Sequence, residues 1–176
     1  MLHFYLILFS LITWAKLDLT GLNYQTMEVQ TIKSSQKKVV IFLSAICPCS
    51  HSHVDLIKKL KVDFPQFDFI GIHSNQNENK EVAKEYFKKN EFGFPILRDE
   101  AAKIADELKA YKTPHAYILD ENDHILYQGG LTNSATAYKA ERFFVREALD
   151  EIVANKSVTQ KEGRTLGCVI SREAEE

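Results

Sequence analysis

An apolar run of five residues, 39–43, leads directly into the segment Ser-Ala-Ile-Cys-Pro-Cys. A short run rich in β-branched residues, following a polar turn, is typical of a fully buried strand. Pro48 suits the first position of a helix, and apolar residues then recur at helical spacing over residues 54–62. We therefore expect Cys47 to lie where a buried strand ends and a helix begins.

The rest of the chain continues this alternation of strands and helices. After an extended lead-in with room for one strand, the patterns predict a buried strand at 67–72, a solvated lysine-rich helix at 78–89, an extended piece at 94–97, a helix at 101–110, a hairpin of 116–119 and 124–127, and an amphipathic helix at 138–154. This order predicts an α/β fold with a central sheet covered by helices on both faces.

Length and composition agree with one globular domain. The chain has 176 residues, of which 45% are hydrophobic and 26% charged, and these values suit a chain with its own hydrophobic core. We expect a lead-in at residues 16–35, the domain at 36–155 and a polar tail at 156–176. The net charge is −2 and basic residues are dispersed, so we expect no nucleic-acid partner. The oligomeric state stays open.

The first 15 residues are almost wholly apolar. The run is shorter than the roughly 20 residues that span a bilayer, and it resembles the apolar core of a signal peptide. Residues 13–15, Thr-Trp-Ala, are a tolerable cleavage site, although no Lys or Arg precedes the run. We expect export to the periplasm or the extracellular space, where disulfides persist, and no membrane span after the leader is removed.

The chain has three cysteines, Cys47, Cys49 and Cys168, which is too few for a disulfide scaffold. A cysteine at a helix N-terminus has a lowered pKa, so Cys47 is the expected nucleophile. Two residues of a helix that are two positions apart point about 200° away from each other, so a bond from Cys47 to Cys49 would be strained and oxidising. Cys168 either resolves an intermediate at Cys47 or ties the tail to Cys49. All three pairings stay open.

Four segments carry a resemblance to a known family. These are residues 40–47 before the cysteine, Thr113-Pro114 with residues 116–120, residues 94–99, and the Gly-Cys-Val-Ile tail of residues 167–170. Together they resemble thioredoxin-like proteins of the redoxin or AhpC-TSA type, including peroxiredoxin-like and TlpA-like members. The resemblance implies a thioredoxin-like fold with a mixed sheet and a redoxin-type insertion.

The resemblance also implies site residues. Pro114 is expected to be cis and to lie beside Cys47, where its loop and Thr113 would bind an extended partner peptide. Ser44 matches the Thr or Ser found three residues before a peroxiredoxin cysteine, and Pro48 follows Cys47 directly. Two features depart from the relatives, because Ser50 stands where thioredoxin has its second cysteine, and the arginine expected of a peroxiredoxin is missing near Pro114.

Three functions are compatible with these residues. The leading hypothesis is an exported thiol–disulfide oxidoreductase that acts on a protein dithiol or disulfide, with Cys49 or Cys168 as the resolving thiol and with no metal or cofactor. A peroxiredoxin-like thiol peroxidase acting on peroxide is the first alternative. The second is a Sco-like module that binds copper or another metal through the cysteines and a histidine among His51, His53 and His115.

Overall fold

The computed structural model describes residues 16–172. Seven strands form its main sheet, in the spatial order β2-β1-β5-β4-β3-β7-β8. They are β1 (Thr20–Asn23), β2 (Val29–Thr31), β3 (Lys38–Phe42), β4 (Asp68–His73), β5 (Ile96–Arg98), β7 (His115–Leu119) and β8 (Ile125–Gly129). The three central strands β3, β4 and β5 pair in parallel, whereas the other pairings are antiparallel. The sheet is therefore mixed, as the resemblance implies.

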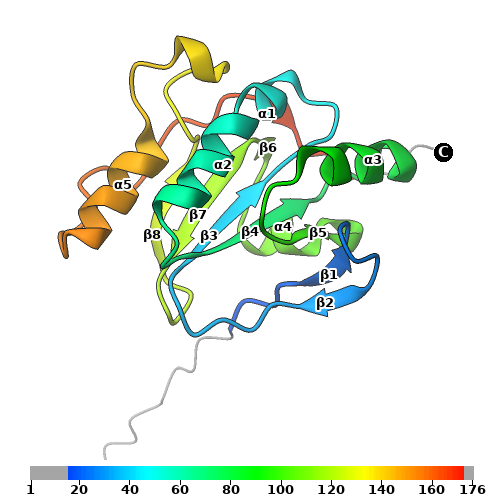
Figure 1. The fold of residues 1–176 in the computed structure, drawn as a ribbon, viewed down its shortest axis with the longest axis horizontal. Coiled ribbons are helices and arrows are strands. Elements are labelled where there is room, and N and C mark those ends of the chain that lie inside the picture. Colours follow the sequence, from blue (N-terminus) through cyan, green and yellow to red (C-terminus); the bar gives the residue numbers. More distant parts are fainter. Residues whose placement is uncertain (1–15, 173–176) are drawn as a thin grey trace, which may run out of the picture.

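Helices cover both faces of this sheet, and Figure 1 shows α2 and α5 on one side of it and α4 on the other. The helices are α1 (Pro48–Ser52), α2 (Val54–Asp63), α3 (Lys80–Asn90), α4 (Lys103–Glu107) and α5 (Phe144–Val153), with 3-10 turns at Glu100–Ala102 and Ala137–Lys139. Two hydrophobic clusters result. One joins α2 and α5 to the sheet through Ile57 and Leu149, and the other joins α4 through Ile104.

Several predicted elements have different limits in the structure. The lead-in forms two strands, not one, because β1 pairs with β5 and so extends the sheet at its edge. The α-helix predicted at 101–110 is shorter in the structure, where α4 spans only Lys103–Glu107. The helix predicted at 138–154 begins at Phe144. The helix predicted at 78–89 begins at Lys80, because the Asn79 side chain accepts hydrogen bonds from the first free N–H groups.

The tail folds back onto the domain. Its strand β9 (Cys168–Val169) pairs antiparallel with β6 (Lys112–Thr113), so that Cys168 lies opposite Thr113. Ile170, directly after the strand, is buried in the α4 cluster. The end of the described chain, residues 168–170, is therefore packed against the domain.

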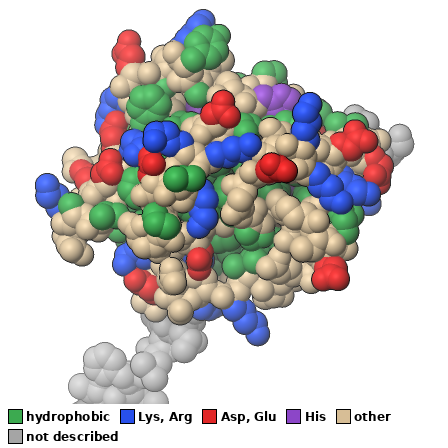
Figure 2. Space-filling view, in the orientation of Figure 1, with side chains coloured by type: hydrophobic (Ala, Val, Ile, Leu, Met, Phe, Trp, Pro, Cys, Tyr) green, Lys and Arg blue, Asp and Glu red, His purple; other side chains and the backbone are tan. Residues whose placement is uncertain are grey.

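Charge is spread widely over the surface. Figure 2 shows basic and acidic side chains interspersed over one face of the molecule. Within residues 16–172, no helix has the length and apolar content needed to cross a bilayer. The predicted signal peptide lies outside the described residues.

Candidate active site

Cys47 lies at the junction that the sequence predicts, five residues after the end of β3 and immediately before α1. Its backbone is extended (φ −76°, ψ 116°) and caps the helix, whose first residue is Pro48. The Cys47 N–H donates to the Ser44 hydroxyl at 3.0 Å. The Cys47 side chain is buried, with 1% of the residue exposed.

The loop at Pro114 lies beside this cysteine. The Thr113–Pro114 peptide bond is cis, as the resemblance implies. The Cys47 thiol donates to the Thr113 carbonyl, with 3.3 Å between sulfur and oxygen. The Thr113 hydroxyl is buried and has no hydrogen-bond partner within residues 16–172, so it is available to a thiolate at Cys47.

The surroundings of Cys47 favour its thiolate. Burial by itself raises the pKa of a thiol. Hydrogen bonds from the Cys168 side chain, the Ser50 backbone and the Thr113 hydroxyl outweigh this effect, so the pKa of Cys47 is lowered. Because the thiolate is the nucleophilic form of cysteine, this thiol is prepared for attack.

The other two cysteines ionise less readily than an ordinary thiol, because the pKa of each is raised. Burial and the negative charge of Cys47 raise the pKa of Cys49. Burial, a hydrogen bond to Cys47 and the charge of Cys47 raise the pKa of Cys168 to about 12. All three cysteines are free, and their thiols interact with one another. They therefore form one cluster, in which Cys47 is the thiol that ionises most readily.

The sequence pattern predicts that Cys47 and Cys49 both lie in the helix, and the structure contradicts this. Only Cys49 lies in α1, whereas Cys47 precedes the helix and has an extended backbone. The helical rotation that would point the two side chains apart therefore does not apply to this pair, and the two thiols interact directly.

A buried acid beside the cluster was not predicted from the sequence. Glu78 was assigned to a solvated helix, but the structure buries it in the loop between β4 and α3. Its carboxylate accepts hydrogen bonds from the Ser44 hydroxyl at 2.5 Å and from the Ala45 N–H at 2.8 Å. It also lies 3.1 Å from Nε2 of His73, the last residue of β4. Burial opposes ionisation, but these hydrogen bonds outweigh it and the pKa of Glu78 is lowered.

One signal in the sequence could have located this acid. Because β3 and β4 are adjacent parallel strands, the segments that follow them meet at one edge of the sheet. Polar residues that follow the second strand are therefore expected near those that follow the first. His73 and Glu78 meet this condition, as Ser44 and Cys47 do.

Two of the three histidines of the metal hypothesis form hydrogen bonds to other groups, and the third is packed against aromatic rings. His51 bonds the Ala45 carbonyl and stacks on Tyr86, whereas His53 bonds the Cys49 carbonyl and the Thr132 hydroxyl. The His115 ring stacks on Tyr117, and burial lowers its pKa to about 4. The part of the chain that the structure describes contains no group of three or more His, Cys, Asp or Glu side chains arranged to hold a metal ion.

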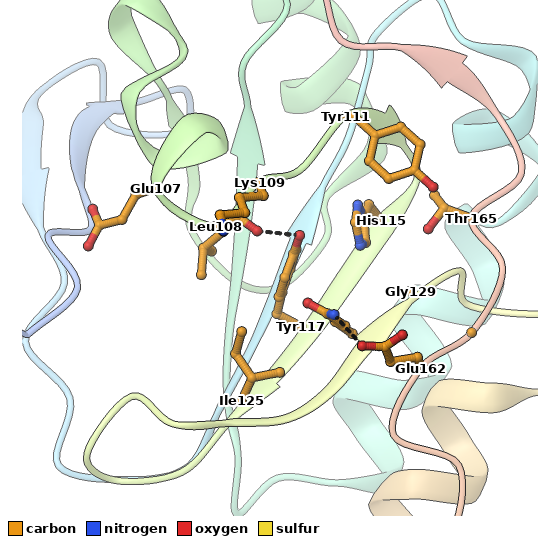
Figure 3. Close-up of a pocket in the computed structure, with 12 residues that line it drawn as sticks. Glu107, Leu108, Lys109, Tyr111, His115, Tyr117, Ile125, Gly129, Glu162 and Thr165 are labelled. Carbon is orange, nitrogen blue, oxygen red and sulfur yellow. Dashed lines mark hydrogen bonds between the residues drawn. The ribbon is translucent and has the colours of Figure 1, made fainter.

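A cavity of about 530 Å³ lies on the α4 side of the sheet (Figure 3). It is lined by His115, Tyr111 and Tyr117, together with tail residues such as Glu162 and Thr165, and none of the three cysteines lines it. The thiol cluster is thus a separate site.

This arrangement of strands and helices places the chain among the proteins of the thioredoxin-like fold. A thiol–disulfide oxidoreductase from Bacteroides fragilis shares the fold at a TM-score of 0.55 and 15% identity, over 63% of this chain and 86% of that one. A secreted Mycobacterium tuberculosis disulfide oxidoreductase homologous to Escherichia coli DsbE shares it at a TM-score of 0.54 and 14% identity, over 62% and 81%.

The particular family follows from the sequence itself. Residues 19–171 match the model of DUF6436, a domain of unknown function, and the chain belongs to that family. An uncharacterised conserved protein from Geobacillus kaustophilus is similar at 27% identity and a TM-score of 0.75, over 88% of both chains. A hypothetical protein from Sinorhizobium meliloti matches at 22% identity and 0.76, over 87% and 90%. No curated protein matches this sequence.

Proposed function

We propose that this protein is an exported thiol–disulfide oxidoreductase in which Cys47 is the nucleophile and Cys168 the resolving thiol. The observation that supports it best is the pairing of β9 with β6, in which Cys168 lies opposite Thr113. The Thr113 carbonyl is the group that accepts from Cys47, so one residue contacts both cysteine-bearing segments. The substrate class is a protein disulfide or dithiol in the exported compartment.

The exchange balances with these two thiols alone. The Cys47 thiolate attacks one sulfur of a partner disulfide, the partner's S–S bond breaks, and the departing sulfur takes up a proton. Cys168 then loses its proton and attacks the Cys47 sulfur, which releases the second partner sulfur as a thiol. The protein is left with a Cys47–Cys168 disulfide, so it has lost two electrons and the partner has gained two. An external dithiol restores the protein by the reverse exchange.

The coupling between the thiols suits this order of events. While Cys47 is a thiolate, its charge and its hydrogen bond help to raise the pKa of Cys168. Once Cys47 is bound in a mixed disulfide, that negative charge no longer exists. Cys168 then ionises more readily, at the stage when its attack is needed.

The peroxidase alternative has less support. A thiol peroxidase needs a group that polarises the peroxide. Among the described residues, the groups that act most strongly on Cys47 are Cys168, Ser50 and Thr113, and none of them carries a positive charge.

The test is trapping of the reduced protein with a thiol alkylator, followed by mass mapping, before and after one equivalent of oxidised glutathione or hydrogen peroxide. We expect Cys47 to be alkylated first near neutral pH, and glutathione to produce a Cys47–Cys168 disulfide. Replacement of Cys47 by Ser should abolish the exchange. A fast peroxide reaction with no reaction towards disulfides would instead favour the peroxidase, and retained exchange in Cys47→Ser would reject the assignment.

Export is tested separately. We expect the protein made in cells to have lost residues 1–15, which the mass of the purified protein measures. Recovery of the full-length chain from the cytoplasm would contradict export and leave the thiol chemistry unaffected.

A further inference from the structure

A single buried carboxylate is linked to both segments that carry the proposed redox pair, directly to the segment of Cys47 and through Asn75 to the segment of Cys168. Oε1 of Glu78 accepts from the Ser44 hydroxyl at 2.5 Å and from the Asn75 side-chain amide at 2.6 Å. Oε2 accepts from the Ala45 N–H at 2.8 Å and lies 3.1 Å from Nε2 of His73. The Glu78 side chain is 2% exposed, so water does not compete for these bonds.

The first arm of this network leads to Cys47. Because the Ser44 hydroxyl donates its proton to Glu78, the Ser44 oxygen is left to accept from backbone donors. It accepts from the Cys47 N–H at 3.0 Å and from the Ile46 N–H at 3.3 Å. Glu78 thereby fixes the turn from which Cys47 projects.

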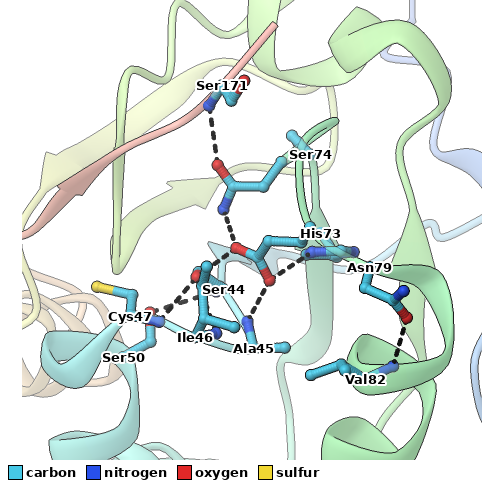
Figure 4. A network of polar contacts seen from close by, with 12 residues as sticks. Ser44, Ala45, Ile46, Cys47, Ser50, His73, Ser74, Asn79, Val82 and Ser171 are labelled. Atoms are coloured by element: carbon cyan, nitrogen blue, oxygen red, sulfur yellow. Dashed lines mark hydrogen bonds and ion pairs between the residues drawn. The ribbon is translucent and has the colours of Figure 1, made fainter. Parts of the chain in front are cut away.

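The second arm leads to the tail. The Asn75 amide nitrogen donates to Glu78, which leaves its oxygen to accept from the Ser171 N–H at 2.9 Å. The neighbouring Gln76 N–H donates to the Ser171 carbonyl at 3.2 Å. Ser171 lies just beyond β9, so the orientation of Asn75 anchors the strand that carries Cys168. Figure 4 shows the contacts that run from Cys47 to Ser171.

A third contact to the Glu78 carboxylate comes from His73, which is itself held by Tyr24. The Tyr24 hydroxyl lies 2.7 Å from Nδ1 of His73. The His73 ring therefore links the Glu78 carboxylate to this hydroxyl. Besides the donors of the two arms, β4 and the segment after β1 thus also fix the position of Glu78.

We propose that Glu78 is a positioning residue that holds Cys47 and Cys168 in the mutual geometry their disulfide requires, through Ser44 on one side and Asn75 on the other. This role rests on the proposed function. Glutamine cannot replace the acid, because a carboxylate accepts at both oxygens and an amide accepts at only one. In Glu78→Gln, the new NH₂ group would face a backbone or side-chain donor that then has no acceptor.

The experiment measures two rates in the reduced full-length protein, the alkylation of Cys47 as a function of pH and the formation of the Cys47–Cys168 disulfide with oxidised glutathione. Misplacing a reacting group by about 1 Å costs about 100-fold in rate. We therefore expect Glu78→Gln to slow disulfide formation by at least about tenfold and to alter the pH profile of alkylation.

Two further variants separate the arms. Ser44→Ala should alter the Cys47 alkylation profile more than Asn75→Ala does. Asn75→Ala should slow disulfide formation more than it slows alkylation. Asp99→Asn is the matched control, because Asp99 is also a buried carboxylate, but it accepts from Ser74 and from the first N–H groups of α4. Asp99→Asn should change neither rate by more than twofold. Thermal unfolding of each variant checks that it is folded.

A folded Glu78→Gln protein whose two rates both stay within twofold of wild type would overturn the positioning role. If Glu78→Gln does not fold, Ser44→Ala and Asn75→Ala test the positioning role instead. The role would be overturned if these two variants changed the alkylation rate equally and the disulfide rate equally. A wild-type protein with no fast-reacting Cys47 and no Cys47–Cys168 disulfide would overturn the proposed function, and the positioning role with it.

Discussion

Cys47 combines burial with a lowered pKa, two properties that ordinarily oppose each other. Its thiolate accepts hydrogen bonds from another thiol, a threonine hydroxyl and backbone N–H groups, and these donors replace the water that burial removes. The donors come from α1, from β6 and from β9. The reactivity of this one atom therefore depends on three separate parts of the chain.

At this scale we predict that Cys168→Ala raises the pKa of Cys47. The substitution removes the hydrogen bond that contributes most to lowering this pKa. The pH midpoint of Cys47 alkylation should therefore move upward relative to wild type, as a pH series with iodoacetamide measures. Cys49→Ser should move it less. An unchanged midpoint in Cys168→Ala would show that β9 does not act on Cys47.

Glu78 should also make stability depend on pH. Its pKa is lowered by folding, so the folded state binds fewer protons and the acid stabilises the fold above the ordinary carboxyl value of about 4.5. This contribution is lost as the pH falls through the lower pKa of the folded state. We expect Glu78→Gln to lower the free energy of unfolding by about 2 kcal/mol at pH 7, and by less below about pH 4. Urea unfolding of both proteins at the two pH values measures this, and a difference that grows at low pH would contradict it.

Among the elements, β9 is the one on which the candidate site depends most. It has only two residues, and its close approach to β6 needs glycine before it. Gly167 has φ +156°, and a Cβ there would lie 1.9 Å from the Thr113 carbonyl oxygen. Any larger residue must push the strand away from the Pro114 loop.

We therefore predict that Gly167→Ala separates Cys168 from Cys47. Formation of the Cys47–Cys168 disulfide should slow by at least about tenfold, since the two sulfurs no longer meet. Gly93→Ala is the matched control, because Gly93 also has a positive φ (+76°) but a Cβ there would contact nothing within 4 Å. It should destabilise the protein by about 1 kcal/mol and leave the disulfide rate unchanged. Equal rates in the two variants would contradict the role of β9.

For the whole molecule, one buried ion pair joins the start of the central strand to the hairpin turn. Lys38 Nζ lies 2.6 Å from an Asp123 oxygen, and their side chains are 3% and 7% exposed. The other Asp123 oxygen accepts from the Leu17 N–H, so the pair also fastens the beginning of the described chain. Removal of one partner leaves the other charge buried without compensation.

We predict that Asp123→Asn lowers the free energy of unfolding by about 3 kcal/mol. The comparison is Glu121→Gln, which breaks the neighbouring, exposed Lys37–Glu121 pair and should change stability little. Urea unfolding of the two variants measures the difference. Equal losses would show that burial of the Lys38–Asp123 pair does not matter for stability.

Several parts of the fold were open to prediction because their signals are local. The buried run of β3, the proline after Cys47 and the β7–β8 hairpin each depend on neighbouring residues, and the structure confirms them. The length of α5 was overestimated, because residues 138–143 continue the apolar pattern without continuing the helix. The prediction of a solvated Glu78 was wrong for a similar reason. A charged residue at the start of a lysine-rich helix has the sequence pattern of a solvated residue, although the structure buries it.

Local patterns were sufficient for the class of fold and for the position of Cys47 between a strand and a helix, because hydrophobic periodicity and a proline act over a few residues. Which thiol lies beside Cys47, and which acid supports the turn before it, depends instead on contacts between distant segments. Ser44 and Glu78 are 34 residues apart, and Asn75 and Ser171 are 96 apart. Such contacts follow from which strand edges pair and from what the packed core leaves buried, and no pattern of neighbouring residues carries that information.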